Sequence, residues 1–146
     1  MASSFLDMLN KARAAQEPRL VLDAIPYARF LGMDMRENGD GGFLSVLPFD
    51  GMLIGNPMLP AIHGGVTGAF LENTAIVTLL WERDITKMPK TINITVEYLR
   101  SGRPQDTFAV GTLTRQGRRV ATVRTEAWQD ERAQPIAVAT AHFLLA

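Results

Sequence analysis

The chain contains no cysteine, so disulfide bonds, thiolate nucleophiles and cysteine-based zinc sites are excluded. It has only two histidines, which argues against a histidine-rich metal site, and we expect no metal. Its 15 basic and 15 acidic residues balance, which argues against a nucleic-acid partner, because such binding depends mainly on phosphate neutralisation. No apolar run reaches the ~18 residues needed to cross a bilayer, and the first ten residues do not resemble a signal peptide. We therefore expect a cytoplasmic protein without a membrane partner.

What is present is typical of a globular domain. Of 146 residues, 47% are apolar and 21% are charged. A chain of this size buries roughly two-thirds of its unfolded surface, which is enough for a core. We expect residues 1–24 to form an N-terminal helical segment and residues 25–146 to form the main domain.

Hydrophobic periodicity predicts two helices. A short amphipathic helix is expected over residues 3–16, with Ser3 or Ser4 as its N-cap and Pro18 as its stop. The longest helical segment runs from Gly64 to about Trp81 and is apolar on nearly every side beyond Glu72, which indicates a buried helix. Strands are predicted at 30–37, 43–49, 91–99, 108–114, 120–128 and 136–145, and residues 50–62 are expected to be a loop.

The short connections between the predicted strands favour antiparallel pairing. One buried helix and a sheet of about six strands leave one economical packing, in which the sheet curls around the helix. The sequence therefore predicts an α+β fold, an antiparallel sheet of about six strands wrapped around a long central helix at about 64–81, with an extra N-terminal helix.

Two glycines, Gly64 and Gly65, stand at the start of the predicted central helix. The N–H groups of a first turn have no partner within the helix, and the helix dipole adds positive charge there. Such donors stabilise an oxyanion that develops on a carbonyl, which is one interpretation of these glycines. The other is a tight turn from loop to helix that needs glycine for steric reasons alone.

Glu72 is a carboxylate in the middle of a helix that is otherwise apolar, where an unpaired buried charge is costly. Helical spacing places Gly68 and Gly65 on the same face, so this face carries few side chains. A carboxylate beside a groove lined by glycine is a candidate general base. The alternative is an interfacial glutamate that pairs with an arginine.

The spacing of Gly64 and Glu72 bears on the oligomeric state. They are eight residues apart, or about 12 Å along a helix axis. A general base acts within ~3 Å of its target or through one water, so one helix cannot easily offer both groups to one carbonyl. Two antiparallel copies can, with Gly64 of one subunit facing Glu72 of the other. We therefore expect a homodimer, doubled to a homotetramer as a dimer of dimers.

This segment resembles a known family. His63-Gly64-Gly65 opens the buried helix, and an acidic residue follows nine positions after the histidine. This pattern is similar to the hotdog-fold acyl-CoA thioesterases of the phenylacetate-pathway (PaaI) and 4-hydroxybenzoyl-CoA thioesterase type, and the likeness covers residues 25–146. The resemblance implies a hotdog fold and hydrolysis of an acyl-CoA or aryl-CoA thioester to free acid and CoA. It implies no cofactor, since coenzyme A is part of the substrate.

The resemblance also implies roles for single residues. The Gly64 amide would polarise the thioester carbonyl, Glu72 would act as nucleophile or general base, and Thr91 would orient the water or the carboxylate. Asn56 is similar to an amide residue that positions the nucleophile, although it lies one residue farther from the histidine than in the family pattern. His63 either touches the thioester or braces the loop.

Arg100 and Arg103 follow a predicted strand and suit bidentate contacts to phosphate. The resemblance places the coenzyme A phosphates near this region, and the alternative is two solvated arginines.

Two other functions compete with hydrolysis. A hotdog dehydratase or hydratase is suggested by residues 55–60, but the loop at 49–52 lacks the histidine that such enzymes need. A non-catalytic acyl-CoA binding protein would have no use for the charge of Glu72.

Overall fold

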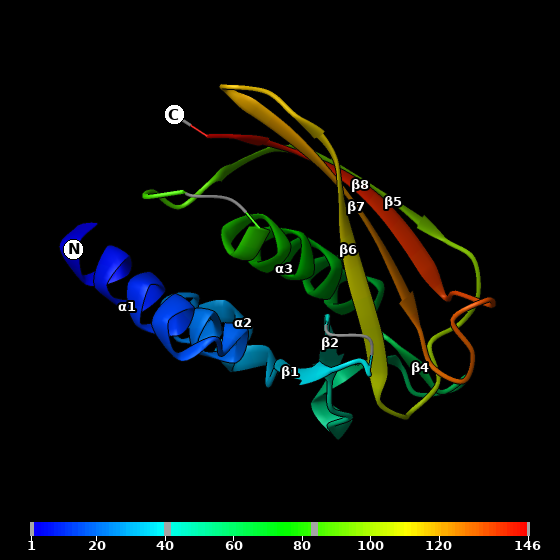
Figure 1. Ribbon diagram of the computed structural model, residues 1–146. Helices are drawn as coiled ribbons and strands as arrows, with labels where there is room; N and C mark the ends of the chain where they lie inside the picture. Colours follow the sequence, from blue (N-terminus) through cyan, green and yellow to red (C-terminus); the bar gives the residue numbers. More distant parts are fainter. Residues whose placement is uncertain (1, 40–41, 83–84, 146) are drawn as a thin grey trace.

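One long helix, α3 (Gly64–Glu82), lies along the concave face of a six-stranded antiparallel sheet (Figure 1). The computed structural model describes residues 2–39, 42–82 and 85–145. The sheet has the order β1-β2-β6-β7-β8-β5. Its strands are β1 (Asp34–Glu37), β2 (Phe43–Leu47), β5 (Lys90–Tyr98), β6 (Thr107–Gln116), β7 (Val120–Trp128) and β8 (Ala137–Leu144). The predicted α+β architecture, a sheet wrapped around a central helix, is confirmed.

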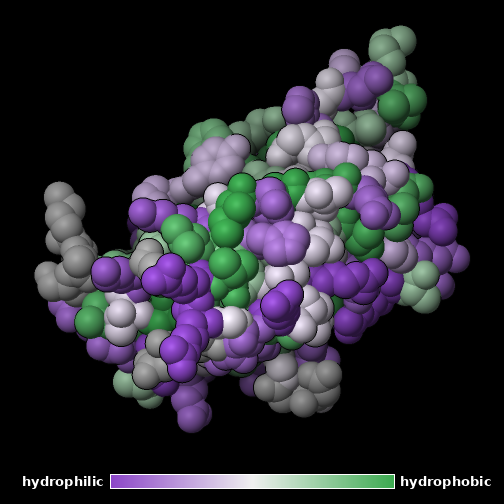
Figure 2. Space-filling model, turned by 90° about the horizontal axis from the view of Figure 1, so that it is seen from above, coloured by the Kyte–Doolittle hydropathy of each residue, from purple (hydrophilic) through white to green (hydrophobic). Residues whose placement is uncertain are grey.

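The core lies between α3 and the sheet. Along β7 and β8 every second residue is buried, and most of these are small: Ala121, Val123, Ala127, Ala137, Ala139 and Ala141. Small side chains on the strands let the helix approach closely, and larger side chains of α3 fill the space between: Phe70, Leu71, Val77, Leu79 and Leu80. Burying each such side chain contributes about 1.5–3 kcal/mol. On the surface seen from above, hydrophilic and hydrophobic residues are interspersed (Figure 2).

The N-terminal segment covers the side of α3 that faces away from the sheet (Figure 1). It consists of α1 (Ala2–Ala15), the 3₁₀ helix η1 (Pro18–Ala24) and α2 (Pro26–Leu31). Arg13 Nη2 donates a hydrogen bond of 3.0 Å to Leu80 O and so satisfies one of the last carbonyls of α3. The predicted first helix is present, but it begins at Ala2, so Ser3 and Ser4 lie inside its first turn and not at the N-cap position.

Two local predictions were wrong. The strand expected from Phe30 begins only at Asp34, because Phe30 belongs to a short helix. Pro26 starts this helix, and Gly32, with φ +79°, ends it in the left-handed conformation. The expected loop at 50–62 contains a 3₁₀ turn, η2 (Gly51–Leu53), and a small hairpin formed by β3 (Ile54–Asn56) and β4 (Ala61–Ile62). Asp40 and Gly41 of the predicted turn at 38–42 lie outside the described residues. No described helix is both long enough and apolar enough to span a membrane.

Candidate active site

The start of α3 leaves one backbone N–H unpaired. The N–H groups of Val66 and Thr67 donate to His63 O at 3.0 and 3.2 Å. The Gly65 N–H donates to His63 Nδ1 at 2.8 Å. Among residues 2–39, 42–82 and 85–145, no acceptor binds the Gly64 N–H. This N–H is therefore available to an acceptor from outside, such as a carbonyl oxygen.

His63 braces the junction between β4 and α3. A Cβ at Gly55 would lie 2.7 Å from both Cα and Cβ of His63, so the hairpin can pack there only with glycine at position 55. The ring then accepts the Gly65 N–H through Nδ1. The structure thus contains a bracing contact of His63, and the interpretation in which His63 touches the thioester stays a prediction.

Tyr98, at the end of β5, was missed by sequence reasoning. Its hydroxyl donates to Gly64 O at 2.6 Å, and a Cβ on Gly64 or Gly68 would lie 3.4 Å from Tyr98 atoms. The Gly64 carbonyl and the Gly65 N–H belong to one peptide group, which is thus held at one end by Tyr98 and at the other by His63. The sequence predicted a strand at 91–99, but the backbone partner of a side chain on that strand is not visible in a sequence.

Glu72 is half-buried and accepts a hydrogen bond of 2.6 Å at Oε2 from Thr91 Oγ1. A β-bulge between Thr91 and Asn93, in the pairing of β5 with β8, makes this contact possible. Regular alternation would place Ile92 on the same face as Ile94. The extra residue instead turns Ile92 outward, where it is 53% exposed, and directs Thr91 toward the helix.

Asn56 lies at the end of β3 and is exposed. Its Oδ1 accepts the Met58 N–H at 3.0 Å, which closes the turn into β4. In the part of the chain that the structure describes, no hydrogen bond joins its side chain to Gly64 or Glu72. Its expected role in positioning a nucleophile stays a prediction.

The two candidate arginines have different surroundings. Arg103 forms an ion pair with Asp130, which also accepts a hydrogen bond from Gln105. Arg100 makes no ion pair or side-chain hydrogen bond with any described residue. It lines a hollow of about 380 Å³ that also contains Gly64, Thr67 and Tyr98. Arg100 is therefore the more available cation beside the free amide.

The candidate site residues lie in two separate places within one protomer. The hollow beside Arg100 contains Gly64 but neither Glu72 nor Thr91. Glu72 lies eight residues farther along α3, about 12 Å along the axis. Gly65 stands at the helix start, and Gly68 lies between the two places under Tyr98. One protomer thus carries a free backbone N–H and a held carboxylate that do not converge on a common point.

Comparison with known proteins covers the segment that contains these groups. Residues 55–144 match the family described as the acyl-CoA thioesterase N-terminal domain. The medium/long-chain acyl-CoA thioesterase YigI of Escherichia coli K12 is 29% identical over 83% of this chain and 86% of its own. A Chromobacterium violaceum protein of known crystal structure is 41% identical with a TM-score of 0.73, covering 99% of this chain and 97% of that one. A Bacillus halodurans protein crystallised with CoA is 21% identical and shares the fold, with a TM-score of 0.76 over 99% of this chain and 89% of that one.

Proposed function

Since the chain belongs to the acyl-CoA thioesterase family and hydrolyses thioesters of coenzyme A, we propose that its active site is formed jointly by two copies of the chain. The observation that carries this proposal is the separation of the Gly64 N–H from Glu72 on α3. An antiparallel pair of α3 helices brings Gly64 of one subunit to Glu72 of the other. The match to the thioesterase family favours hydrolysis over the dehydratase and binding-protein alternatives.

The proposed chemistry needs few groups. A thioester carbonyl is electrophilic and a thiolate leaves readily, so the site must activate a nucleophile and stabilise the oxyanion. Thr91 holds Oε2 of Glu72, which leaves Oε1 to take a proton from an attacking water. The water oxygen bonds to the acyl carbon, the oxyanion accepts the Gly64 N–H, and the carbon–sulfur bond breaks to release CoA thiolate. In the nucleophilic variant, Glu72 attacks first and the resulting anhydride is hydrolysed.

The edge of the sheet supports self-association. β5 is the last strand of the sheet, and Ile92, Tyr98 and Leu99 at this edge are exposed. An unprotected edge strand is a site of unwanted pairing, which a second copy of the chain would cover. We propose a homodimer formed along this edge, and a dimer of dimers as the complete assembly.

The proposed substrate is a medium- or long-chain acyl-CoA, by extension from the E. coli relative. Arg100 is the proposed contact for a coenzyme A phosphate, because it lines the hollow that holds the Gly64 amide. Arg103 has a weaker claim, since Asp130 already neutralises its guanidinium.

Subunit mixing tests the composite site. Gly64→Pro removes the amide at a helix position that tolerates proline, and Glu72→Gln removes the carboxylate. Each variant alone should be nearly inactive on the best substrate from a panel of acyl-CoA esters. Refolding the two together should restore about a quarter of wild-type activity, because half of the dimers are mixed and each mixed dimer has one intact site.

The mixing experiment has clear contrary outcomes. Absence of recovery, with mixed dimers verified by two affinity tags, would place both groups in one subunit. A wild-type protein that sediments as a monomer at micromolar concentration would contradict the dimer. Refolding each variant with itself is the control, and circular dichroism checks that Gly64→Pro retains the helix.

A further inference from the structure

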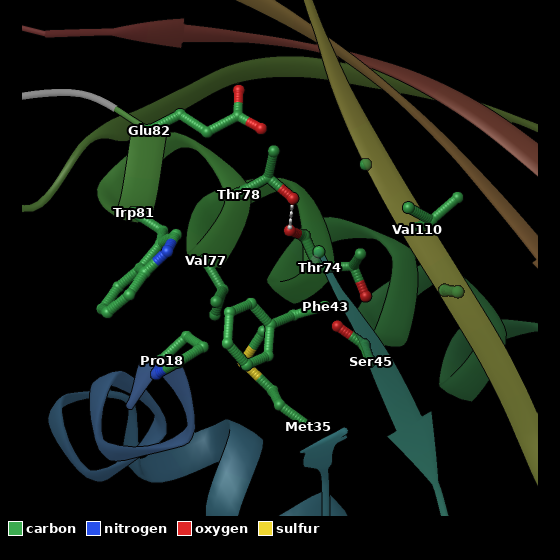
Figure 3. A pocket seen from close by; sticks show the side chains of 13 residues that line it. Pro18, Met35, Phe43, Ser45, Thr74, Val77, Thr78, Trp81, Glu82 and Val110 are labelled. Atoms are coloured by element: carbon green, nitrogen blue, oxygen red, sulfur yellow. Dashed lines mark hydrogen bonds between the residues drawn. The ribbon is translucent and has the colours of Figure 1, made fainter. Parts of the chain in front are cut away.

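A cavity of about 210 Å³ lies between α3 and strands β2 and β6 (Figure 3). We call it the α3–β2 cavity. Trp81 lines it and stands nine residues after Glu72, which is about half a turn around the helix axis. Neither Gly64, Glu72 nor Thr91 lines this cavity. It is therefore separate from the proposed thioesterase site and lies on the other side of α3.

One end of the α3–β2 cavity is aromatic. The rings of Phe43 and Trp81 meet edge to face, with centroids 6.2 Å apart and planes at 77°. Val77 and Met35 complete this apolar wall. An apolar protein cavity of ~150 Å³ holds benzene. The α3–β2 cavity thus has room for a ligand with one aromatic ring.

The other end carries hydroxyl groups. Ser45 is only 2% exposed, and its hydroxyl makes no hydrogen bond within the described ranges 2–39, 42–82 and 85–145. Its oxygen is not among the fully enclosed ones, because the side chain lines the cavity. Figure 3 shows its oxygen facing that of Thr74. Thr74 Oγ1 donates to Phe70 O at 2.8 Å, so its lone pairs are left to accept. A hydroxyl that opens onto the cavity without a partner in the protein can form a hydrogen bond with a polar group of a ligand.

The charges around the α3–β2 cavity limit the ligand. Glu82 is the one charged side chain among the described residues that line it, and no lysine or arginine does. An anion such as a fatty-acid carboxylate would enter without a counter-charge and beside a glutamate, which is unfavourable. A neutral molecule with a hydrogen-bond donor meets the acceptors of Ser45 and Thr74.

We propose that the α3–β2 cavity binds a small neutral aromatic molecule with one hydroxyl or N–H donor. The ring packs against the wall formed by Phe43 and Trp81, and the donor is bound by Ser45 and Thr74. Such a ligand stabilises the folded protein by mass action and raises its melting temperature with ligand concentration. The site is independent of acyl-CoA binding, because it lies on the opposite side of α3 from Glu72.

The probes are phenol, toluene and benzoate. Their binding is measured by the fluorescence of Trp81 in the Trp128→Phe variant. We expect phenol to saturate with a dissociation constant of about 1 mM or tighter, toluene to bind more weakly and benzoate not to bind. Ser45→Ala should weaken phenol binding roughly fivefold, by loss of one hydrogen bond. Thr112→Ala is the matched control, since this hydroxyl lies on the exposed face of β6.

Other outcomes overturn the proposal. A fluorescence change that never saturates indicates a cavity filled by water only. Equal binding of benzoate would contradict the charge argument, and displacement of phenol by an acyl-CoA would assign the cavity to the acyl group. Phenol should bind the Glu72→Gln variant as it binds the parent protein, so this test stands or fails separately from the hydrolysis mechanism.

A different set of contacts supports a second inference, which rests on the proposed function. The geometry points to Tyr98 as a positioning residue for the Gly64 amide. Its hydroxyl fixes the Gly64 carbonyl at 2.6 Å, and the adjoining peptide, which carries the free N–H, shares the Gly64 Cα. The carbonyl of that peptide, His63 O, is held by the Val66 and Thr67 N–H groups, and further rotation about the Gly64 backbone, which no side chain restricts, is limited by the contacts of the next peptide. Tyr98 and His63 supply these contacts.

Tyr98→Phe tests this role, because it keeps the ring and removes only the hydroxyl. We expect kcat to fall about tenfold with KM nearly unchanged, since a misdirected oxyanion donor affects the transition state more than binding. Tyr27→Phe, at the other tyrosine of the chain, is the control, because Tyr27 is exposed on α2. An unchanged kcat, or a loss carried by KM alone, would overturn the inference. The residual activity distinguishes this result from a failure of hydrolysis itself.

Discussion

Glu72 and Glu82 are carboxylates of the same helix with different surroundings. Glu72 is half-buried and is held by the Thr91 hydroxyl at 2.6 Å. Glu82, ten residues later, lies at the rim of the α3–β2 cavity, and no residue within 2–39, 42–82 or 85–145 donates a hydrogen bond to it. Its side chain is exposed overall, yet partial burial raises the pKa of its carboxyl above the ordinary value.

The difference shows what separates a candidate base from a carboxylate at the end of a helix. Burial alone raises a pKa and fixes nothing in space, as at Glu82. A donor such as Thr91 orients one oxygen and leaves the other free to react, as at Glu72. Gly65 and Gly68, on the same side of the helix, are covered by the His63 ring and by Tyr98. The orientation of the carboxylate is therefore what distinguishes the two glutamates.

The largest expected effect comes from exchanging each glutamate for glutamine. Glu72→Gln should lower kcat by about 10²–10⁴-fold, because the side chain keeps its shape but loses its base, while binding of the acyl-CoA persists. Glu82→Gln should leave kcat unchanged and is the matched control on the same helix. Steady-state release of CoA thiol measures both. Near-wild-type turnover by Glu72→Gln would remove the proposed role of this residue.

The hydrogen bond that distinguishes Glu72 can be removed alone. Thr91→Val keeps the shape of the side chain and deletes the donor to Oε2. We expect kcat to fall roughly 10- to 100-fold, the range for losing a hydrogen bond to a charged group. Thr95→Val, at an exposed position of the same strand, should have no effect. Wild-type kinetics for Thr91→Val would mean that the carboxylate needs no positioning.

The central helix and most strands could be predicted because each has a clear hydrophobic period. The helix α2 was missed, since Phe30 reads as apolar strand sequence and only Pro26 and Gly32 indicate a helix. The hairpin of β3 and β4 was hidden among glycines and prolines. Such elements are set by tertiary contacts, such as Ile62 N–H to Gly102 O at 2.8 Å, that no local pattern records.

The candidate site divides in the same way. Gly64 and Glu72 stood out because a glycine run and a mid-helix carboxylate are exceptions within apolar sequence. Thr91 was reached only through a resemblance, because its orientation depends on a bulge that breaks the alternation of β5. Tyr98 was missed, since its partner is a backbone carbonyl 34 positions away. Contacts made through backbone geometry are the part that sequence periodicity does not encode.

The contrast between a held and a free charged group also applies to the arginines. Arg100→Ala should raise KM for an acyl-CoA several-fold relative to the wild type. This difference in KM should shrink at high salt, because screening weakens contacts to phosphate. Arg103→Ala should change KM less, because Asp130 already pairs with this side chain. Titrations of initial rate at low and high ionic strength measure both. An equal change for the two variants would contradict the distinction.

The smallest expected effect concerns stability at the rim of the α3–β2 cavity. Because the pKa of Glu82 is raised in the folded state, the folded protein binds more protons than the unfolded chain at pH values between the ordinary and the raised pKa. The contribution of this group to stability is therefore fully present below the ordinary pKa and is lost as pH rises through the raised pKa. Glu82→Gln removes that loss, so its melting temperature should fall less than that of the wild type as pH rises through this window. The difference in melting temperature should be about 2 °C or less, since the side chain is exposed overall.

Glu131→Gln, at an exposed loop position, deletes the same charge elsewhere and serves as the control. A Glu82→Gln profile that runs parallel to the wild type would show that burial against the cavity does not disfavour the charged form.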